Sequence, residues 1–135
     1  MECIIDTREH KIKDFFLNHP KSKIKKLIQV ENLDIGDILF RYQGKIILLI
    51  ERKTMEDLGS SIRDGRHKEQ KFRIMNSNIP LGNVIFLVEG TLKDLDFGNI
   101  KKNTLQGAIH NTMFRDGIKV YRTLDIGETC FFIER

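Results

Sequence analysis

Acidic residues and a lysine stand at the ends of two neighbouring predicted strands. Glu51, Arg52 and Lys53 close a run that is apolar at five successive positions, and Asp37 begins the preceding strand. Residues two apart in a strand point to the same face, so we expect Glu51 and Lys53 to project together and Arg52 to project to the opposite face. A hairpin turn at Gln43-Gly44 pairs the two strands and places the carboxylate of Asp37 beside Glu51.

This arrangement predicts a particular chemistry. Two adjacent carboxylates repel each other unless a cation lies between them. Hard oxygen ligands with room for water and phosphate suit Mg²⁺, with Mn²⁺ as a substitute. Such a cation would polarise a phosphate ester, and Lys53 would orient the attacking water or neutralise developing charge. The pattern therefore indicates phosphodiester hydrolysis, although a Glu-Arg-Lys tripeptide taken alone is more typical of a solvated, salt-bridged strand end.

Other charged residues near this group admit a structural interpretation as well as a functional one. Asp57 follows Thr54 at capping spacing, so we expect it to cap a helix, to support the site, or both. Asp6 and Glu9 follow the first predicted strand and could reach the same edge of the sheet, although by position alone they are ordinary surface charges. The basic segment 66–73 is either a solvated helix face or a surface that contacts phosphates.

Strands and helices alternate along the chain, with one hairpin among them. The apolar patterns predict strands at residues 2–6, 27–30, 38–42, 45–53, 84–88 and 118–121, and helices at 11–17, 54–63, 67–75 and 105–114. Because the strand at 45–53 is apolar at consecutive positions, we expect it to be central and covered on both faces. The alternation predicts an α/β fold, in which helices flank a mixed central β-sheet on both sides, within one domain spanning residues 1–135.

Length and composition narrow the class of protein. A chain of 135 residues with 40% hydrophobic and 31% charged residues is typical of a soluble globular domain. It has no apolar run long enough for a membrane segment or a secretory signal. The two cysteines show no zinc or disulfide spacing, and we expect the four histidines at the surface. The net charge of +4 is compatible with a polyanionic partner without identifying one.

Several stretches of the chain match one known pattern. Residues 6–9 resemble a D-x-R-E opening, 36–37 a G-D step, and 51–57 an E-R-K-x-x-x-D signature. Residues 60–73 resemble the stretch S-S-I-x-D-G-R-x-x-E-Q-K-x-R, and segments 104–112 and 117–123 resemble the last helix and strand of the same family. Together these motifs resemble the XPF-type structure-specific endonucleases, and within them the crossover junction endonuclease (MUS) branch, over nearly the whole chain.

The resemblance implies a restriction-endonuclease-like core and a set of residue roles. Asp37 and Glu51 would be Mg²⁺ ligands and, together with Lys53, the catalytic residues. The supporting acids would be Asp6, Glu9 and Asp57. The residues with a structural or DNA-binding role would be Arg8, Arg52, Arg66, Gln70 and Lys71. The implied substrates are branched DNAs of repair and recombination, namely 3′ flaps, replication forks and nicked junctions.

The resemblance also raises questions about assembly. Family members usually carry a tandem helix-hairpin-helix module after the nuclease domain, and because no such hairpins occur here we expect a truncated or minimal form. They also pair with a related nuclease-fold subunit, so we expect a homodimer or a heterodimer, without membrane association. An intracellular location is expected, either the nucleus of a eukaryote or a viral replication site in the cytoplasm.

Three other interpretations stay open. The chain could be a catalytically silent DNA-binding partner subunit of such a nuclease. It could instead be a nuclease of the same core with another substrate, such as a junction resolvase or a restriction-type enzyme. A purely structural α/β protein would leave the ligand-like order of acids and lysine unexplained.

Overall fold

One mixed β-sheet runs through the structure, a computed structural model that describes residues 1–19, 22, 24–91 and 102–134. In this described part the sheet has six strands in the order β2-β1-β3-β4-β5-β6. The strands are β1 (Glu2–Asp6), β2 (Ile28–Glu31), β3 (Ile38–Tyr42), β4 (Lys45–Thr54), β5 (Val84–Glu89) and β6 (Lys119–Thr123). β3 is antiparallel to both of its neighbours, whereas the other adjacent pairs are parallel. The sheet is therefore mixed, as the sequence predicts.

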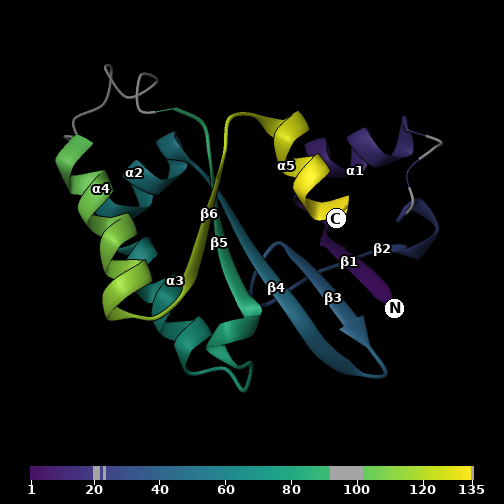
Figure 1. Cartoon of the computed structure of the whole chain (residues 1–135), viewed down its shortest axis with the longest axis horizontal. Coiled ribbons are helices and arrows are strands. Elements are labelled where there is room, and N and C mark those ends of the chain that lie inside the picture. Colours follow the sequence, from purple (N-terminus) through teal and green to yellow (C-terminus); the bar gives the residue numbers. More distant parts are fainter. Residues whose placement is uncertain (20–21, 23, 92–101, 135) are drawn as a thin grey trace.

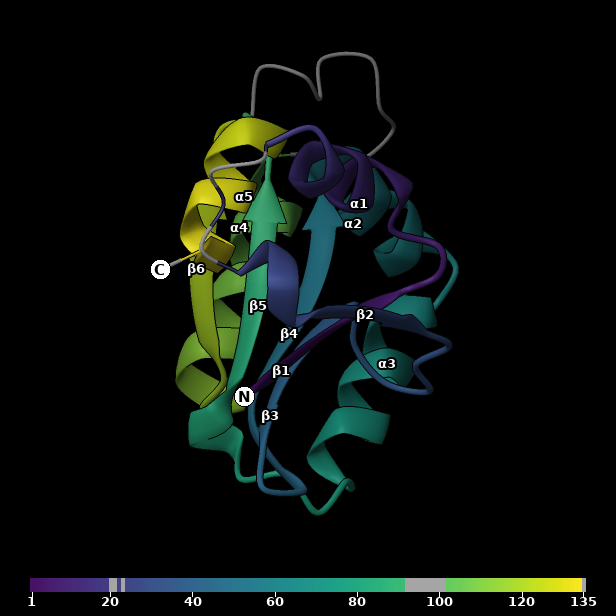
Figure 2. The ribbon, with the colours of Figure 1, turned by 90° about the vertical axis from the view of Figure 1, so that its right-hand side faces the viewer.

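Helices cover both faces of this sheet (Figures 1 and 2). On one face lie α1 (His10–Leu17) and α5 (Ile126–Glu134). On the other face lie α2 (Met55–Arg63), α3 (Arg66–Met75) and α4 (Lys102–His110), which continues into the π-helical turn η4 (Asn111–Arg115). This layering confirms the predicted α/β fold. Within the described ranges, the helices are too short or too polar to span a bilayer.

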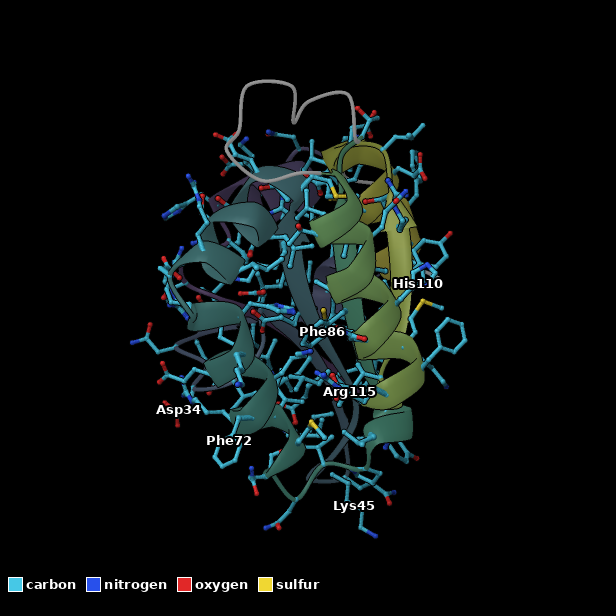
Figure 3. The ribbon with its side chains drawn as sticks, turned by 90° about the vertical axis from the view of Figure 1, so that its left-hand side faces the viewer. Asp34, Lys45, Phe72, Phe86, His110 and Arg115 are labelled. Atoms are coloured by element: carbon cyan, nitrogen blue, oxygen red, sulfur yellow. The ribbon has the colours of Figure 1, made fainter. Side chains whose placement is uncertain are left out.

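Alternation along the central strands divides the apolar side chains between two cores. Ile50 of β4 and Leu87 of β5 belong to the core beneath α1 and α5. Their neighbours Leu49 and Phe86 belong to the core beneath α3, and Figure 3 shows Phe86 in the layer behind α3 and α4. The faces of β4 are thus fixed by its apolar half, and the charged residues that follow continue the same alternation.

The structure differs from the sequence prediction in four places. β4 is not covered along its whole length, because its hairpin end lies away from α1 and α5 (Figure 1) and Ile47 is 40% exposed. β2 begins at Ile28, because residues Lys25–Leu27 form a 3₁₀ turn. The helix predicted at 105–114 ends at His110 and gives way to η4. The terminal segment, for which no element was predicted, forms α5.

The loop before β3 makes backbone hydrogen bonds to β1 and β4, near the carboxyl ends of these two strands. The Asp37 N–H donates to the carbonyl of Ile50, and the Asp37 carbonyl accepts from the Asp6 N–H, both at 2.8 Å. Gly36 adopts a φ of +76°, and a Cβ at this position would lie 2.4 Å from Leu49 Cδ1. Only glycine therefore lets the loop approach β4 this closely. Asp37 is brought to the carboxyl ends of β1 and β4, which is where ligands tend to bind in α/β folds.

Candidate active site

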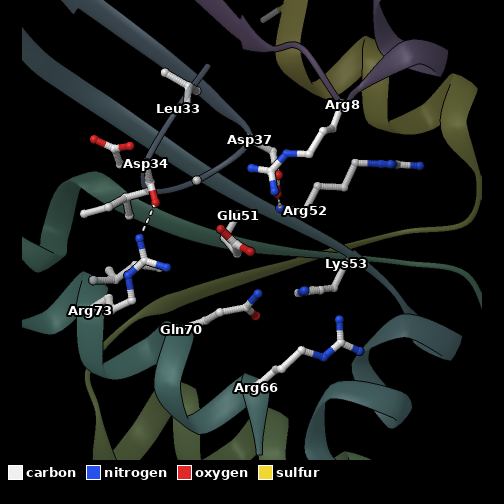
Figure 4. Close-up of a pocket in the computed structure, with 13 residues that line it drawn as sticks. Arg8, Leu33, Asp34, Asp37, Glu51, Arg52, Lys53, Arg66, Gln70 and Arg73 are labelled. Carbon is white, nitrogen blue, oxygen red and sulfur yellow. Dashed lines mark hydrogen bonds between the residues drawn. The ribbon is translucent and has the colours of Figure 1, made fainter. Parts of the chain in front are cut away.

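A cleft of about 440 Å³ lies at this edge of the sheet, between the loop 33–37 and α3 (Figure 4). Asp37 comes from the loop, and Glu51 and Lys53 come from the end of β4. The exposed guanidinium groups in the lining belong to Arg8, Arg66 and Arg73. The structure thus brings together the three residues predicted to be catalytic, and surrounds them with positive charge.

Asp37 and Glu51 are the less exposed acids of this cleft, which the exposed Asp34 also lines. Asp37 Oδ2 accepts a hydrogen bond of 2.7 Å from the backbone N–H of Arg52, which holds the carboxylate over the end of β4. Burial raises the pKa of Asp37 above its ordinary value, although this hydrogen bond and the charge of Lys53 oppose the shift. Burial, followed by the charge of Asp37, raises the pKa of Glu51 to about 8. The two carboxyl groups are therefore not readily ionised at the same time, and a cation between them would stabilise their ionised forms.

The donor set of the cleft fits a hard divalent cation that keeps several ligands from outside the protein. Within the described ranges, no group of three or more His, Cys, Asp or Glu side chains is placed to hold a metal ion. Asp37 and Glu51 alone are therefore too few for a closed site of these residue types. Mg²⁺ is commonly held by one or two carboxylates and retains water and phosphate ligands, so the residues present fit it.

The opposite face of β4 carries a buried ion-pair network. Arg52 donates from Nε and Nη2 to the two carboxylate oxygens of Glu89, at 3.0 and 2.7 Å, and from Nη1 to Glu9, at 3.0 Å. All three side chains are at most 12% exposed. Thr129 of α5 donates a further hydrogen bond of 2.6 Å to Glu89. Arg52 thus faces away from its two neighbours in the chain, as strand alternation predicts.

The acids Asp6, at the end of β1, and Glu9, after it, lie beside the cleft and do not line it. Burial and the charge of Asp37 raise the pKa of Glu9 to about 7, against the effect of its ion pair with Arg52. Asp6 is 1% exposed, and its carboxylate accepts from the Leu33 N–H and from Arg8 Nε, at 2.8 and 2.7 Å. Burial acts to raise the pKa of Asp6, but these hydrogen bonds bring it below its ordinary value. Asp6 therefore fastens the loop to β1.

Asp57 lies in the first turn of α2. Its backbone N–H donates to the hydroxyl of the N-cap residue Thr54 at 3.1 Å, so the predicted cap is present. The side chain of Asp57 is exposed and is not part of the cleft lining. The structure therefore places Asp57 in a capping position and does not bring it to the acid pair.

One face of α3 lines the cleft. Arg66, Gln70 and Arg73, spaced four and then three residues apart, all lie along it. Arg66 pairs with Asp64 at 2.7 Å, and Arg73 Nη2 donates to the carbonyl of Asp34 at 2.7 Å. The second contact fastens α3 to the loop across the cleft.

Another face of α3 is buried, which the basic sequence does not suggest. Lys71 is 6% exposed, and its Nζ donates to Asp116 at 2.7 Å, so it turns away from the cleft into a structural contact. His67, expected at the surface, is buried against Phe86 with ring centroids 6.2 Å apart. Burial, followed by the charge of Lys71, lowers the pKa of His67 to about 4. The surface prediction for His67 was wrong because this face of α3 packs on the sheet.

Sequence reasoning gave two parts of the lining no individual role. Arg73 was considered only as part of the basic segment 66–73, a solvated helix face or a phosphate-contacting surface, and residues 33–35 were given no place in the site. A signal for Arg73 exists, because its spacing from Arg66 and Gln70 puts the three residues on one helical face. The sequence of the loop 33–35 shows no comparable spacing that would indicate a place in the cleft.

Comparison with known proteins identifies similar sequences. The ERCC4 domain family profile matches residues 5–135. Structure-specific endonuclease subunit MUS81 of Rattus norvegicus is 37% identical over 118 residues, covering 77% of this chain and 20% of that protein. The protein of the same name from Danio rerio is 42% identical over 121 residues, again covering 77% and 20%. Crossover junction endonuclease mus81 of Aspergillus fumigatus is 30% identical over 158 aligned positions, covering 100% and 26%. The chain therefore spans about a fifth to a quarter of these relatives' length.

Solved structures show the same fold. XPF from Aeropyrum pernix has a TM-score of 0.69 and 25% identity, covering 98% of this chain and 63% of the other. A structure of that protein in complex with DNA has a TM-score of 0.67 and 26% identity, covering 98% and 61%.

Proposed function

The chain belongs to the ERCC4 domain family, and from this premise we propose that it is a Mg²⁺-dependent endonuclease that hydrolyses phosphodiester bonds in branched DNA. The observation that carries the proposal is the acid pair Asp37 and Glu51, with Lys53 on the same face of β4, in one cleft. The names of the relatives, which are structure-specific and crossover junction endonucleases, support the reaction class. The structural neighbour that was solved with DNA supports the substrate class.

In this proposal Asp37 and Glu51 hold the Mg²⁺ ion, with Mn²⁺ as a substitute. When bound, the ion supplies positive charge that polarises the scissile phosphate and lowers the pKa of a bound water. Asp37 is oriented for this role by the N–H of Arg52. Burial and the charge of Asp37 raise the pKa of Glu51, and a divalent cation beside the two carboxylates would lower it.

Lys53 contributes a positive charge next to the acid pair. Its side chain points into the cleft from the same face of β4 as Glu51 (Figure 4). From that position the ammonium group would donate to the attacking water, or to the phosphate oxygen on which negative charge develops. Arg8, Arg66 and Arg73 would bind flanking phosphates and so align the strand with the acid pair.

We further propose a substrate preference and an assembly. The preferred DNAs are 3′ flaps, forks and nicked junctions, in repair or recombination. The active assembly is a homodimer or a heterodimer with a related nuclease-fold subunit, in the nucleus of a eukaryote or at a cytoplasmic viral replication site. The word "subunit" in the names of the MUS81 relatives supports an assembly of more than one chain.

The test is cleavage of labelled 3′-flap, fork, nicked-junction, four-way-junction and linear DNAs in Mg²⁺, by the chain alone and with a related subunit. We expect Glu51→Gln to slow cleavage about 1000-fold and Lys53→Ala about 100-fold, in the range found when charge-stabilising groups are removed from active sites. Glu128→Gln in α5 and Lys45→Ala at the exposed hairpin make the same chemical changes away from the cleft. Both should cleave at the wild-type rate.

The outcomes separate the alternatives. Cleavage of branched DNA that is lost in both cleft variants and kept in both controls supports the proposal. Absence of cleavage by the wild type in every assembly and metal would favour a catalytically silent DNA-binding subunit. Cleavage confined to four-way junctions would favour a junction resolvase. Equal rates for wild type and Glu51→Gln would remove the acid pair from the chemistry.

A further inference from the structure

One buried polar atom of the cleft lacks a partner. Gln70 Oε1 is buried and has no hydrogen-bond donor among the described residues. Figure 4 shows the amide of Gln70 inside the cleft, pointing toward Glu51 and Lys53. A buried amide oxygen without a partner costs free energy, and such atoms in folded proteins usually have one. The partner of Gln70 Oε1 is therefore expected to be a water molecule or another ligand that the cleft binds.

The chemistry of an amide oxygen limits what that partner is. Oε1 is a hydrogen-bond acceptor only, and so are the phosphate oxygens of DNA, which would bind the NH₂ group of Gln70 instead. A divalent cation does bind glutamine carbonyl oxygens, along with carboxylates and water. Oε1 and the oxygens of Asp37 and Glu51 are all of this kind, and they line the same cleft.

The small number of carboxylates in the cleft also indicates that another kind of side chain could bind the cation. No third Asp, Glu, His or Cys side chain joins Asp37 and Glu51 in a metal-holding group, as far as the described residues extend. Any further protein ligand would then be a neutral oxygen. Gln70 supplies a side-chain oxygen of this kind in the lining.

α3 is anchored on both sides of Gln70. Arg73 binds the carbonyl of Asp34 across the cleft at 2.7 Å. Lys71 binds Asp116 at 2.7 Å behind the helix. Because both contacts lie within three residues of Gln70, its backbone is held in place before any ligand arrives, which lowers the entropic cost of binding.

From these observations we propose that Gln70 is a third protein ligand of the divalent cation, binding it through Oε1 beside Asp37 and Glu51. The inference rests on the proposed function, because it requires that the acid pair holds a metal ion. It assigns Gln70 to the metal, and not to structural support or to DNA.

The test is Mn²⁺ binding to the full chain without DNA, measured by the loss of the free-ion signal in electron paramagnetic resonance. We expect Gln70→Leu to weaken Mn²⁺ binding about tenfold, the lower end of the losses seen when supporting groups of metal sites are removed. Gln70→Glu should bind Mn²⁺ at least as tightly as wild type, because a carboxylate oxygen replaces the amide oxygen. Gln106→Leu, the same substitution at an exposed position of α4, should leave the affinity unchanged.

Asp37→Asn distinguishes failure of this inference from failure of the proposed metal site. Loss of Mn²⁺ binding in Asp37→Asn but wild-type affinity in Gln70→Leu would overturn the role of Gln70 and leave the acid pair intact. Wild-type affinity in Asp37→Asn would overturn the metal site, and the role of Gln70 with it. If Gln70→Leu does not fold, Gln70→Glu decides, because Mn²⁺ binding weaker than wild type would contradict a ligand role.

Discussion

The two faces of β4 at its carboxyl end place charged groups in opposite situations. On the face beneath α1 and α5, Arg52 donates three hydrogen bonds to Glu9 and Glu89, and all three side chains are buried. On the cleft face, Glu51 is 8% exposed and has a pKa raised to about 8 by burial and by Asp37. On one face the charged side chains are paired within the protein, and on the other we propose that a cation binds between Asp37 and Glu51.

The difference shows how one strand carries structural residues on one face and the residues proposed for catalysis on the other. Consecutive residues of β4 point to opposite faces, so Arg52 stands between the two residues proposed for catalysis and directs its side chain to Glu9 and Glu89. The two faces are connected through the backbone, because the N–H of Arg52 donates a hydrogen bond to the carboxylate of Asp37. We infer that the network fixes the position of β4, while the acid pair lowers stability until a ligand binds.

Removing Arg52 should produce the largest change in stability. Arg52→Met leaves Glu9 and Glu89 buried without their cation, and breaking a buried ion pair in this way costs about 3–5 kcal/mol. Urea unfolding in EDTA measures the free energy of unfolding. Arg63→Met, at an exposed position of α2, provides the control. A loss below about 1 kcal/mol, the range of surface pairs, would show that the network does not support the strand.

The carboxyl groups with raised pKa values, Glu51 on the cleft face and Glu9 in the ion-pair network, should make the free energy of unfolding depend on pH. The pKa values of Glu51 and Glu9 are raised to about 8 and about 7, so between about pH 5 and 8 the folded protein keeps protons that the unfolded chain has released. The free energy of unfolding therefore falls as pH rises through this window. We expect the wild type in EDTA to lose on the order of 2 kcal/mol.

The Glu51→Gln variant isolates the cleft contribution to that slope. Its free energy of unfolding should fall less with pH, because Glu51 no longer contributes to the slope, and it should exceed that of wild type at about pH 8. Urea unfolding in EDTA at several pH values measures both quantities. A slope as steep as that of the wild type would mean that Glu51 is not held in a destabilising environment.

Local patterns in the sequence were sufficient to predict most of this arrangement. The apolar run of β4 fixed the alternation, so the opposite directions of Glu51 and Arg52 could be predicted. The hairpin at Gln43-Gly44, where both residues have positive φ, fixed the pairing that brings Asp37 to β4. These features depend on residues close in the chain, which is the range over which periodicity and turn chemistry act.

Contacts between distant residues could not be predicted in the same way. Arg52 binds Glu89 across 37 residues, and Lys71 binds Asp116 across 45. A periodic pattern indicates which face a charged side chain occupies but not which partner it meets there. For the same reason the segment 66–73 was predicted as a solvated helix face or a phosphate-contacting surface, although Lys71 is buried. α5 was missed because its run Cys130–Ile133 is apolar throughout and shows no helical period.

The most direct test of the central claim, that Asp37 and Glu51 together form a divalent-cation site, is the melting temperature in EDTA and in Mg²⁺. In about 10 mM Mg²⁺, binding to the folded state should raise the melting temperature of wild type by about 3–5 °C. Glu51→Gln should melt above wild type in EDTA and show no shift with Mg²⁺. An equal Mg²⁺ shift in both proteins, or a Glu51→Gln variant that melts below wild type in EDTA, would contradict the account.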